Sequence, residues 1–314
     1  MIKELFKIPP PFQLNIIFFI FMGLIVMIFS YKIPAWPDFL VIFISMAIFQ
    51  YFLCKIKENG VLNFLKNVGF PLFSVLVAFD SVGVITPLVN PEDLDQFLMT
   101  LDCKILGFYP YIVSQKITFP LLTEIMQISY CVYYFLPFVI GVYLLLKGDE
   151  MEFQRALFLL LLCYYLSYVG YLLFPALGPR YYVLDAFYID LKGVFLAEKI
   201  NSLLNSLEGI KRDAFPSGHV AVSLLVLYIM WEKNKKLFYI FFIPVILLII
   251  STIYCRYHYF VDVIGGVFLT VVTLFIGRLY YNFWLYKNEI SINKRQRRIY
   301  VKSSCENRFQ EPGN

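Results

Sequence analysis

The chain contains only two histidines, and each lies beside residues that could share chemistry with it. His258 stands in the stretch RYHYFVD, where Asp262 follows four residues later. Side chains at this spacing share one face of a helix, so the carboxylate can fix the imidazole tautomer and strengthen the ring as a nucleophile. The stretch therefore predicts a nucleophilic histidine with an acidic orienting partner.

The second histidine, His219, ends the sequence PSGH. Pro216 suits the first turn of a helix, and Ser217 and Gly218 would leave backbone N–H groups free at the helix start, where an anion can bind. Glycine at position 218 has no side chain to obstruct a close approach. The motif predicts an anion site at the start of a helix, with His219 in the same turn.

Two arginines complete the set. Arg180 lies in FPALGPRYY and Arg256 opens the RYHYFVD stretch. A guanidinium donates two parallel hydrogen bonds to a phosphate, so the pair could form a clamp. This combination is suited to phosphoryl transfer, with His258 attacking phosphorus and His219 protonating the leaving oxygen. Arginines and N–H groups would take the part that a cation plays elsewhere, so we expect no metal and no cofactor.

Each of these residues also has an ordinary structural explanation. A single histidine at a helix end can be a capping residue, and a single arginine at a membrane boundary often extends toward lipid headgroups. Both histidines of the chain lie in such clusters, however, and both are expected on the same face. The catalytic interpretation is therefore favoured.

The elements that position these residues are predicted to be membrane-spanning helices. The chain is 60% hydrophobic and 16% charged, with a mean hydropathy of +0.71, whereas soluble domains are about 45–50% apolar and about 25% charged. Its net charge of +5 does not indicate nucleic acid, because the basic residues lie between and after apolar runs. Apolar runs of about 20 residues predict an all-α polytopic bundle of about eight transmembrane helices, at 14–31, 37–54, 68–89, 121–146, 155–174, 215–231, 237–255 and 259–284.

Charge asymmetry predicts the orientation of the bundle. With the N-terminus inside, the cytoplasmic segments hold 17 Lys and Arg residues and the outer loops hold nine. Basic residues concentrate in cytoplasmic loops, so both termini are expected inside and the active site on the non-cytoplasmic side. We expect a transmembrane hairpin over 1–66, a phosphatase or phosphotransferase domain over 67–286, and a basic cytoplasmic tail over 287–314 that contains KRQRR and contacts anionic lipid.

The motifs resemble those of the type 2 phosphatidic acid phosphatase superfamily. PSGH matches its second signature, and the spacing of His258 and Asp262 matches its third, although Arg256 lies two residues before the histidine rather than six. RYHYFVD, FPALGPRYY and, more weakly, LDCKILGFYP are similar to the branch that contains inositol phosphorylceramide synthases. The resemblance covers roughly 91–280, and the first ~60 residues fall outside it.

The resemblance implies His258 as nucleophile, Asp262 as its partner and His219 as general acid. It also implies phosphate contacts from Ser217, Gly218 and Arg180. The family's first motif has a lysine where this chain has Leu173, so that contact is absent or comes from elsewhere. Lys211 and Arg212 are possible substitutes, and they could equally be solvated loop charges.

Several functions remain open at this stage. A lipid phosphate phosphatase and a phosphotransferase that moves a phospho-headgroup to a lipid hydroxyl share the same first step, so the motifs cannot separate them. A catalytically inactive transporter or scaffold is a third reading, although the chain shows no internal repeat. Metal-dependent lipid transfer would need acidic residues on facing helices. In every case the expected partners are membrane lipids. Asp80, inside the third apolar run, is either functional or structural.

Overall fold

The computed structural model describes residues 7–56, 60–207 and 211–308, and the side chains within them except those of 205–207 and 289–308. The described residues form helices and connecting turns and contain no strand. The all-α expectation is therefore confirmed. The eight long helices are α2 (Pro10–Ile28), α3 (Trp36–Leu53), α5 (Phe70–Val89), α8 (Pro120–Lys147), α9 (Glu150–Leu173), α12 (Gly218–Lys233), α13 (Lys235–Tyr254) and α14 (Phe260–Arg308).

Short helices connect the long ones. They are α4 (Gly60–Phe64) with a π-helical turn at Leu65–Gly69, α6 (Asp95–Leu106), α7 (Pro110–Val113) with a 3-10 turn at Ser114–Ile117, α10 (Pro179–Tyr182) with a 3-10 turn at Leu184–Ala186, and α11 (Ala197–Leu207). The helix α14 continues past the predicted end of the last span at 284. Apart from residues 287 and 288, the predicted basic tail lies outside the residues whose side chains are described.

Among the described residues, seven helices are long and apolar enough to cross a membrane. The remaining predicted span, 215–231, corresponds to α12, which has only 16 residues. A helix of this length measures about 24 Å, whereas the hydrocarbon core of a membrane is about 30 Å thick. The chain enters the bundle before this helix begins: the Cβ of an alanine at position 170 in α9 would collide with the ring of Pro216. The helix is short because the segment before it already lies between its neighbours.

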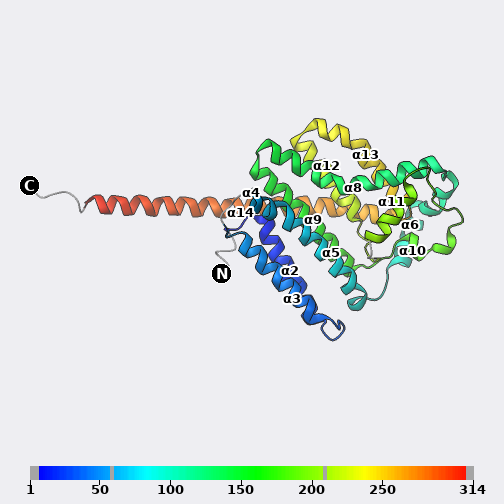
Figure 1. Cartoon of the computed structure of the whole chain (residues 1–314), viewed down its shortest axis with the longest axis horizontal. Coiled ribbons are helices and arrows are strands. Elements are labelled where there is room, and N and C mark those ends of the chain that lie inside the picture. The colour runs from blue at the N-terminus through cyan, green and yellow to red at the C-terminus, as the bar shows by residue number, and fades with distance from the viewer. Residues whose placement is uncertain (1–6, 57–59, 208–210, 309–314) are drawn as a thin grey trace, which may run out of the picture.

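The long helices run between two distinct ends of the bundle (Figure 1). At one end lie α4, the start of α2 and the part of α14 that leaves the bundle. At the opposite end lie α6, α10 and α11. The second of these ends, called here the capped end, carries the loops in which the sequence motifs occur.

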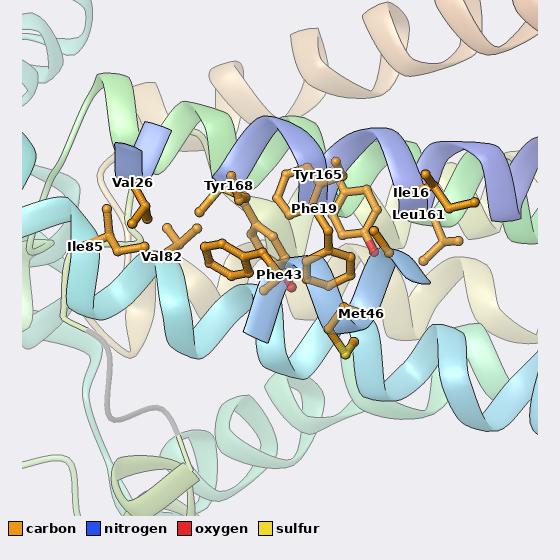
Figure 2. Packing of buried hydrophobic residues seen from close by; sticks show 14 of the residues in the cluster. Ile16, Phe19, Val26, Phe43, Met46, Val82, Ile85, Leu161, Tyr165 and Tyr168 are labelled. Atoms are coloured by element: carbon orange, nitrogen blue, oxygen red, sulfur yellow. The ribbon is translucent and has the colours of Figure 1, made fainter. Parts of the chain in front are cut away.

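The first two helices pack against α5 and α9 through a dense apolar cluster (Figure 2). The ring of Phe18 stacks on that of Tyr165 with centroids 3.8 Å apart, and Phe19 and Phe43 are fully buried. Asn15 adds polar links inside this cluster, as its amide group donates to Gln50 at 2.9 Å and to Ser74 at 3.3 Å, and its oxygen accepts from the Tyr165 hydroxyl at 2.5 Å. Hydrogen bonds of this kind tie helices together in lipid.

Glycines let α14 approach α12 closely. A Cβ at position 266 would lie 2.7 Å from the carbonyl oxygen of Ser217 and 2.8 Å from the Cβ of Val220. One turn further along α14, the hydroxyl of Thr270 donates to the carbonyl of Ala221 at 3.1 Å. The glycine therefore brings the two motif-bearing helices into contact at the capped end.

Candidate active site

The three motif segments, 174–182, 213–219 and 255–262, meet at the capped end. Backbone hydrogen bonds join them in pairs: Ala214 N to Ala176 O at 3.1 Å, Arg180 N to Arg256 O at 2.8 Å, and Ser217 N to Asp262 O at 3.1 Å. Residues between 38 and 76 positions apart in sequence are thus held in fixed register by the backbone alone.

His258 is buried, and its ring orientation is set by its Nδ1 atom. This nitrogen lies 2.9 Å from the carbonyl oxygen of Ala214 and 3.4 Å from Oδ2 of Asp262. A carbonyl oxygen can only accept, so Nδ1 carries the proton and the neutral ring has its lone pair on Nε2. The nearer partner of Nδ1 is therefore a backbone carbonyl, and the predicted partner, Asp262, lies 0.5 Å farther away.

Asp262 also belongs to the start of α14. The helix begins at Phe260, two residues after His258, and the Oδ2 atom of Asp262 accepts a hydrogen bond from Tyr259 N at 2.8 Å. The carboxylate is fully buried. It therefore caps the helix and lies beside the imidazole at the same time.

His219 is the second residue of α12, and its ring centroid is 5.7 Å from that of His258. Two aromatic rings of α8 pack on it, Tyr130 at 4.5 Å and Tyr133 at 4.3 Å between centroids. The Tyr130 hydroxyl lies 3.5 Å from Nδ1 of His219. The two histidines are close enough to act on one phosphoryl group, and the tyrosine wall beside them was not foreseen from the sequence.

The start of α12 differs in detail from the sequence expectation. The helix begins at Gly218, with Ser217 as its N-cap, so Pro216 precedes the helix rather than lying in its first turn. The Ser217 hydroxyl accepts a hydrogen bond from Val220 N at 3.4 Å. Contrary to the sequence prediction, the Ser217 N–H is not free, because it donates to the backbone carbonyl of Asp262. A Cβ at Gly218 would lie 2.6 Å from the Tyr171 hydroxyl, which explains the glycine.

Arg180 lies at the centre of the first motif segment. Gly178 before it has φ of +80°, and a Cβ there would collide with the carbonyl of Tyr257, so this tight approach to the third segment requires glycine. The guanidinium of Arg180 stacks over the rings of Tyr257 and Tyr181, at 4.6 and 4.8 Å from their centroids. Cation–π contacts of this kind hold the side chain in place.

Arg256 is only 8% exposed and adopts a left-handed backbone conformation, with φ of +66°. One terminal nitrogen donates to the carbonyl of Ile189 at 2.6 Å, and the guanidinium lies 4.1 Å from the ring centroid of Phe187. Its Nε atom has no hydrogen-bond partner within the described part of the chain. Burial lowers the pKa of Arg256, although an arginine remains a cation near neutral pH. The two arginines are joined through their backbones, and Arg256 also holds the 187–189 segment.

Neither suggested substitute for the missing lysine is confirmed as a phosphate ligand. Arg212 forms a two-pronged ion pair with Asp93, at 2.5 and 3.0 Å. Lys211 lies over the ring of Tyr181, 5.2 Å from its centroid. Tyr181 therefore lies next to both Lys211 and Arg180.

Comparison with known proteins places these motifs in a family. The model of the PAP2 superfamily matches residues 97–276, which include every histidine and arginine described above. The chain belongs to the PAP2 superfamily. The range agrees with the extent of the resemblance seen in the sequence, and with the seven candidate spans it supports a multi-pass membrane protein. The 97–276 segment is called the PAP2 region below.

One curated relative extends this assignment. A PA-phosphatase related-family protein of Dictyostelium discoideum is 28% identical over 179 residues, which cover 50% of this chain and 32% of the relative. The chain thus matches about a third of that relative's length. No solved structure matches the chain. The similarity to inositol phosphorylceramide synthases remains a prediction.

Two carboxylates of α6 anchor the PAP2 motifs, and sequence reasoning missed both. Asp95, two residues before the PAP2 region, accepts hydrogen bonds from Leu177 N, Gly178 N and the Tyr259 hydroxyl, each at 2.8 Å. Asp102 accepts from Phe260 N and Val261 N, both at 2.9 Å.

Burial raises the pKa of both carboxyl groups, and these donors oppose the rise. The signal available in the sequence was the seven-residue spacing of Asp95 and Asp102, because residues two helical turns apart lie on the same face of a helix.

A cavity of about 700 Å³ begins beside His219 and runs along the bundle between α5, α8 and α9. Its end at the active site is formed by Asp213, Gly218 and His219. Most of its remaining wall is apolar or aromatic, and Asp80 of α5 is part of that wall. The PAP2 region supplies α8 and α9, whereas α5 lies outside it.

Proposed function

We propose that the protein is a metal-independent phosphatase of membrane lipid phosphates that works through a phosphohistidine at His258. The observation that supports this most directly is the pair of histidine rings, 5.7 Å apart, with Nδ1 of His258 held by the Ala214 carbonyl. Because Nδ1 carries the proton, Nε2 is the nitrogen with a lone pair for attack on phosphorus.

In the first step, Nε2 of His258 forms a bond to phosphorus and the bond between phosphorus and the lipid oxygen breaks. His219 gives its proton to that oxygen, which leaves as an alcohol. Positive charge developing on the His258 ring is stabilised by the Ala214 carbonyl and by Asp262, whose Oδ2 lies 3.4 Å from Nδ1.

In the second step, His219 takes a proton from water, and the water oxygen attacks phosphorus as the bond to Nε2 breaks. Inorganic phosphate leaves and both histidines return to their starting states. Arg180, the Nε–H of Arg256, the Ser217 hydroxyl and the backbone N–H of Gly218 are the proposed donors to the equatorial oxygens.

Phosphoryl or headgroup transfer to a lipid alcohol is the second candidate. The observation that favours it is the cavity ending at His219, because it gives an apolar molecule a route from the membrane to the general base. In this version a lipid hydroxyl replaces water in the second step, and the atoms balance in the same way.

The roles of the two histidines can be distinguished with nitrophenyl phosphate as substrate. Nitrophenol leaves readily as an anion, so its release needs little help from a general acid. We expect His219→Ala to release a burst of nitrophenol and then to stall, because nothing activates water. The stalled protein should carry acid-labile, base-stable phosphate on His258, and activity should survive chelation of divalent ions.

The controls test the assignment of roles. His258→Ala should show neither burst nor label, and Ser223→Ala, a buried change one turn further along α12, should behave as wild type. Loss of the burst in His219→Ala, or a persisting label in His258→Ala, would show that the roles are wrongly assigned. Release of a lipid product only when an alcohol-bearing lipid is added would favour transfer over hydrolysis.

A further inference from the structure

The wall of the cavity contains a carboxylate that the proposed reaction does not use. Asp80 lies on α5, nine residues before the helix ends at Val89, which is about 14 Å into a membrane-spanning segment. Its side chain is exposed and lines the cavity. Within the described part of the chain, no hydrogen bond or ion pair reaches this carboxylate.

The position of Asp80 along the cavity can be traced through packed rings. Its neighbour Phe79 lies 5.8 Å from Tyr168 of α9, between ring centroids, and Tyr168 lies 6.0 Å from Tyr171. The Tyr171 hydroxyl is next to Gly218, at the start of α12. Asp80 therefore lies a few side chains away from the catalytic end of the cavity.

A carboxylate in this setting needs a partner. Ionisable groups inside a membrane are costly and pair with one another, with backbone groups or with a ligand. The rest of the cavity wall near Asp80 is mainly aliphatic and aromatic, and the described residues of the wall include no lysine or arginine. A hydrogen-bond donor for the Asp80 carboxylate would therefore come from the molecule that occupies the cavity.

We propose that the cavity holds the hydrocarbon part of the lipid substrate and that Asp80 selects lipids carrying an N–H or O–H donor part-way along that hydrocarbon part. The inference rests on the proposed function for the position of the phosphate at the histidines. Asp80 lies on α5, outside the PAP2 region, so this selectivity would come from a helix that the PAP2 motifs do not include.

A matched series of single-chain probes tests this. The probes are an eighteen-carbon alkyl phosphate and the same molecule with a hydroxyl or an amino group on a carbon part-way along the chain. For the full-length protein in nanodiscs, kcat/KM should be about tenfold higher for the donor-bearing probes, as expected for one hydrogen bond to a charged group. Asp80→Leu should remove this preference, so that the three probes are turned over with similar kcat/KM.

One variant, Asp80→Asn, distinguishes an amine donor from a hydroxyl donor. An amine would pair with the charge, so Asp80→Asn should remove the preference for the amino probe. A hydroxyl can still donate to an amide oxygen, so Asp80→Asn should keep part of the preference for the hydroxyl probe. Ser81→Ala is the control at the same depth, because Ser81 is buried and does not line the cavity. An unchanged preference in Asp80→Leu, or no preference in wild type, would overturn the proposal.

A binding measurement keeps this result separate from the proposed chemistry. Non-hydrolysable phosphonate forms of the same probes should raise the thermal unfolding midpoint more when they carry a donor, and Asp80→Leu should abolish that difference. If no probe is turned over but the phosphonates still discriminate, the proposed reaction fails and the role of Asp80 stands. Equal shifts from all three phosphonates would count against Asp80 whatever the kinetics show.

Discussion

Arg256, a proposed phosphate ligand, adopts an unfavourable backbone conformation. Its φ of +66° is a region that residues other than glycine rarely adopt. The conformation is held by the hydrogen bond from Arg180 N to Arg256 O and by the contact of its guanidinium with Ile189. Strain of this kind concentrates at functional sites. A glycine would fit the backbone better, so the side chain is what the site requires.

Two substitutions at Arg256 should have different effects. Arg256→Ala removes the guanidinium and keeps the strained backbone, whereas Arg256→Gly removes both. We expect Arg256→Gly to be the more stable variant by about 1 kcal/mol, with equal losses of kcat/KM in the two variants. Thermal unfolding in detergent and turnover of nitrophenyl phosphate provide the measurements. If the glycine variant regained wild-type activity, the guanidinium would have no part in the reaction.

At the scale of elements, α6 anchors the segment 255–262, which carries His258, although α6 is not part of that segment. Both oxygens of Asp102 accept N–H groups from the first turn of α14, directly after His258 and Tyr259. Asp95 links the segment before Arg180 to Tyr259 in the same way. The helix thus sets where His258, the proposed nucleophile, and Arg180 lie relative to each other.

Asp102→Asn tests this positioning role. Asparagine offers one acceptor oxygen, and its NH₂ group would face a backbone N–H, so the first turn of α14 should lose about 1–3 kcal/mol of stability. We expect kcat to fall with little change in KM, because the nucleophile moves while the groups that bind phosphate stay. Asp185→Asn, an exposed change at the same end of the bundle, is the control. An Asp102→Asn protein that melts lower but keeps its wild-type kcat would show that α6 only stabilises the fold.

The sequence predicted the elements better than the contacts between them. Apolar length placed all eight long helices, and the motifs brought His219, His258 and Asp262 together correctly. The partner of His258 Nδ1 is a backbone carbonyl, which leaves no signature in residue types. The anchoring by Asp95 and Asp102 depends on how α6 folds over the bundle end, and the short α12 depends on Pro216 packing against Gly170. Such features arise from tertiary packing, which a single sequence does not specify.

At the scale of the whole molecule, the arrangement of helices agrees with one orientation. The start of α2 and the outgoing part of α14 lie at the end of the bundle opposite α6, α10 and α11 (Figure 1). Ion pairs cluster near the first of these ends, where Arg155 contacts Glu152 and Glu232, and Lys233 contacts Glu152. Together with the 17-to-9 distribution of basic residues, this arrangement leads to a prediction that the capped end, with the active site, faces away from the cytoplasm.

Two acidic positions test the orientation with the same change of charge. Asp190 is exposed in the loop between α10 and α11, and Glu150 is exposed at the start of α9, at the other end of the bundle. In a cysteine-free background, Asp190→Cys should react with a membrane-impermeant thiol reagent in intact cells, because it faces the outside or a compartment continuous with it. Glu150→Cys should react only after the membrane is permeabilised, since the reagent cannot otherwise reach the cytoplasmic side. Labelling of Glu150→Cys alone in intact cells would invert the bundle, place His219 and His258 on the cytoplasmic side, and require the lipid phosphate to be drawn from the inner leaflet.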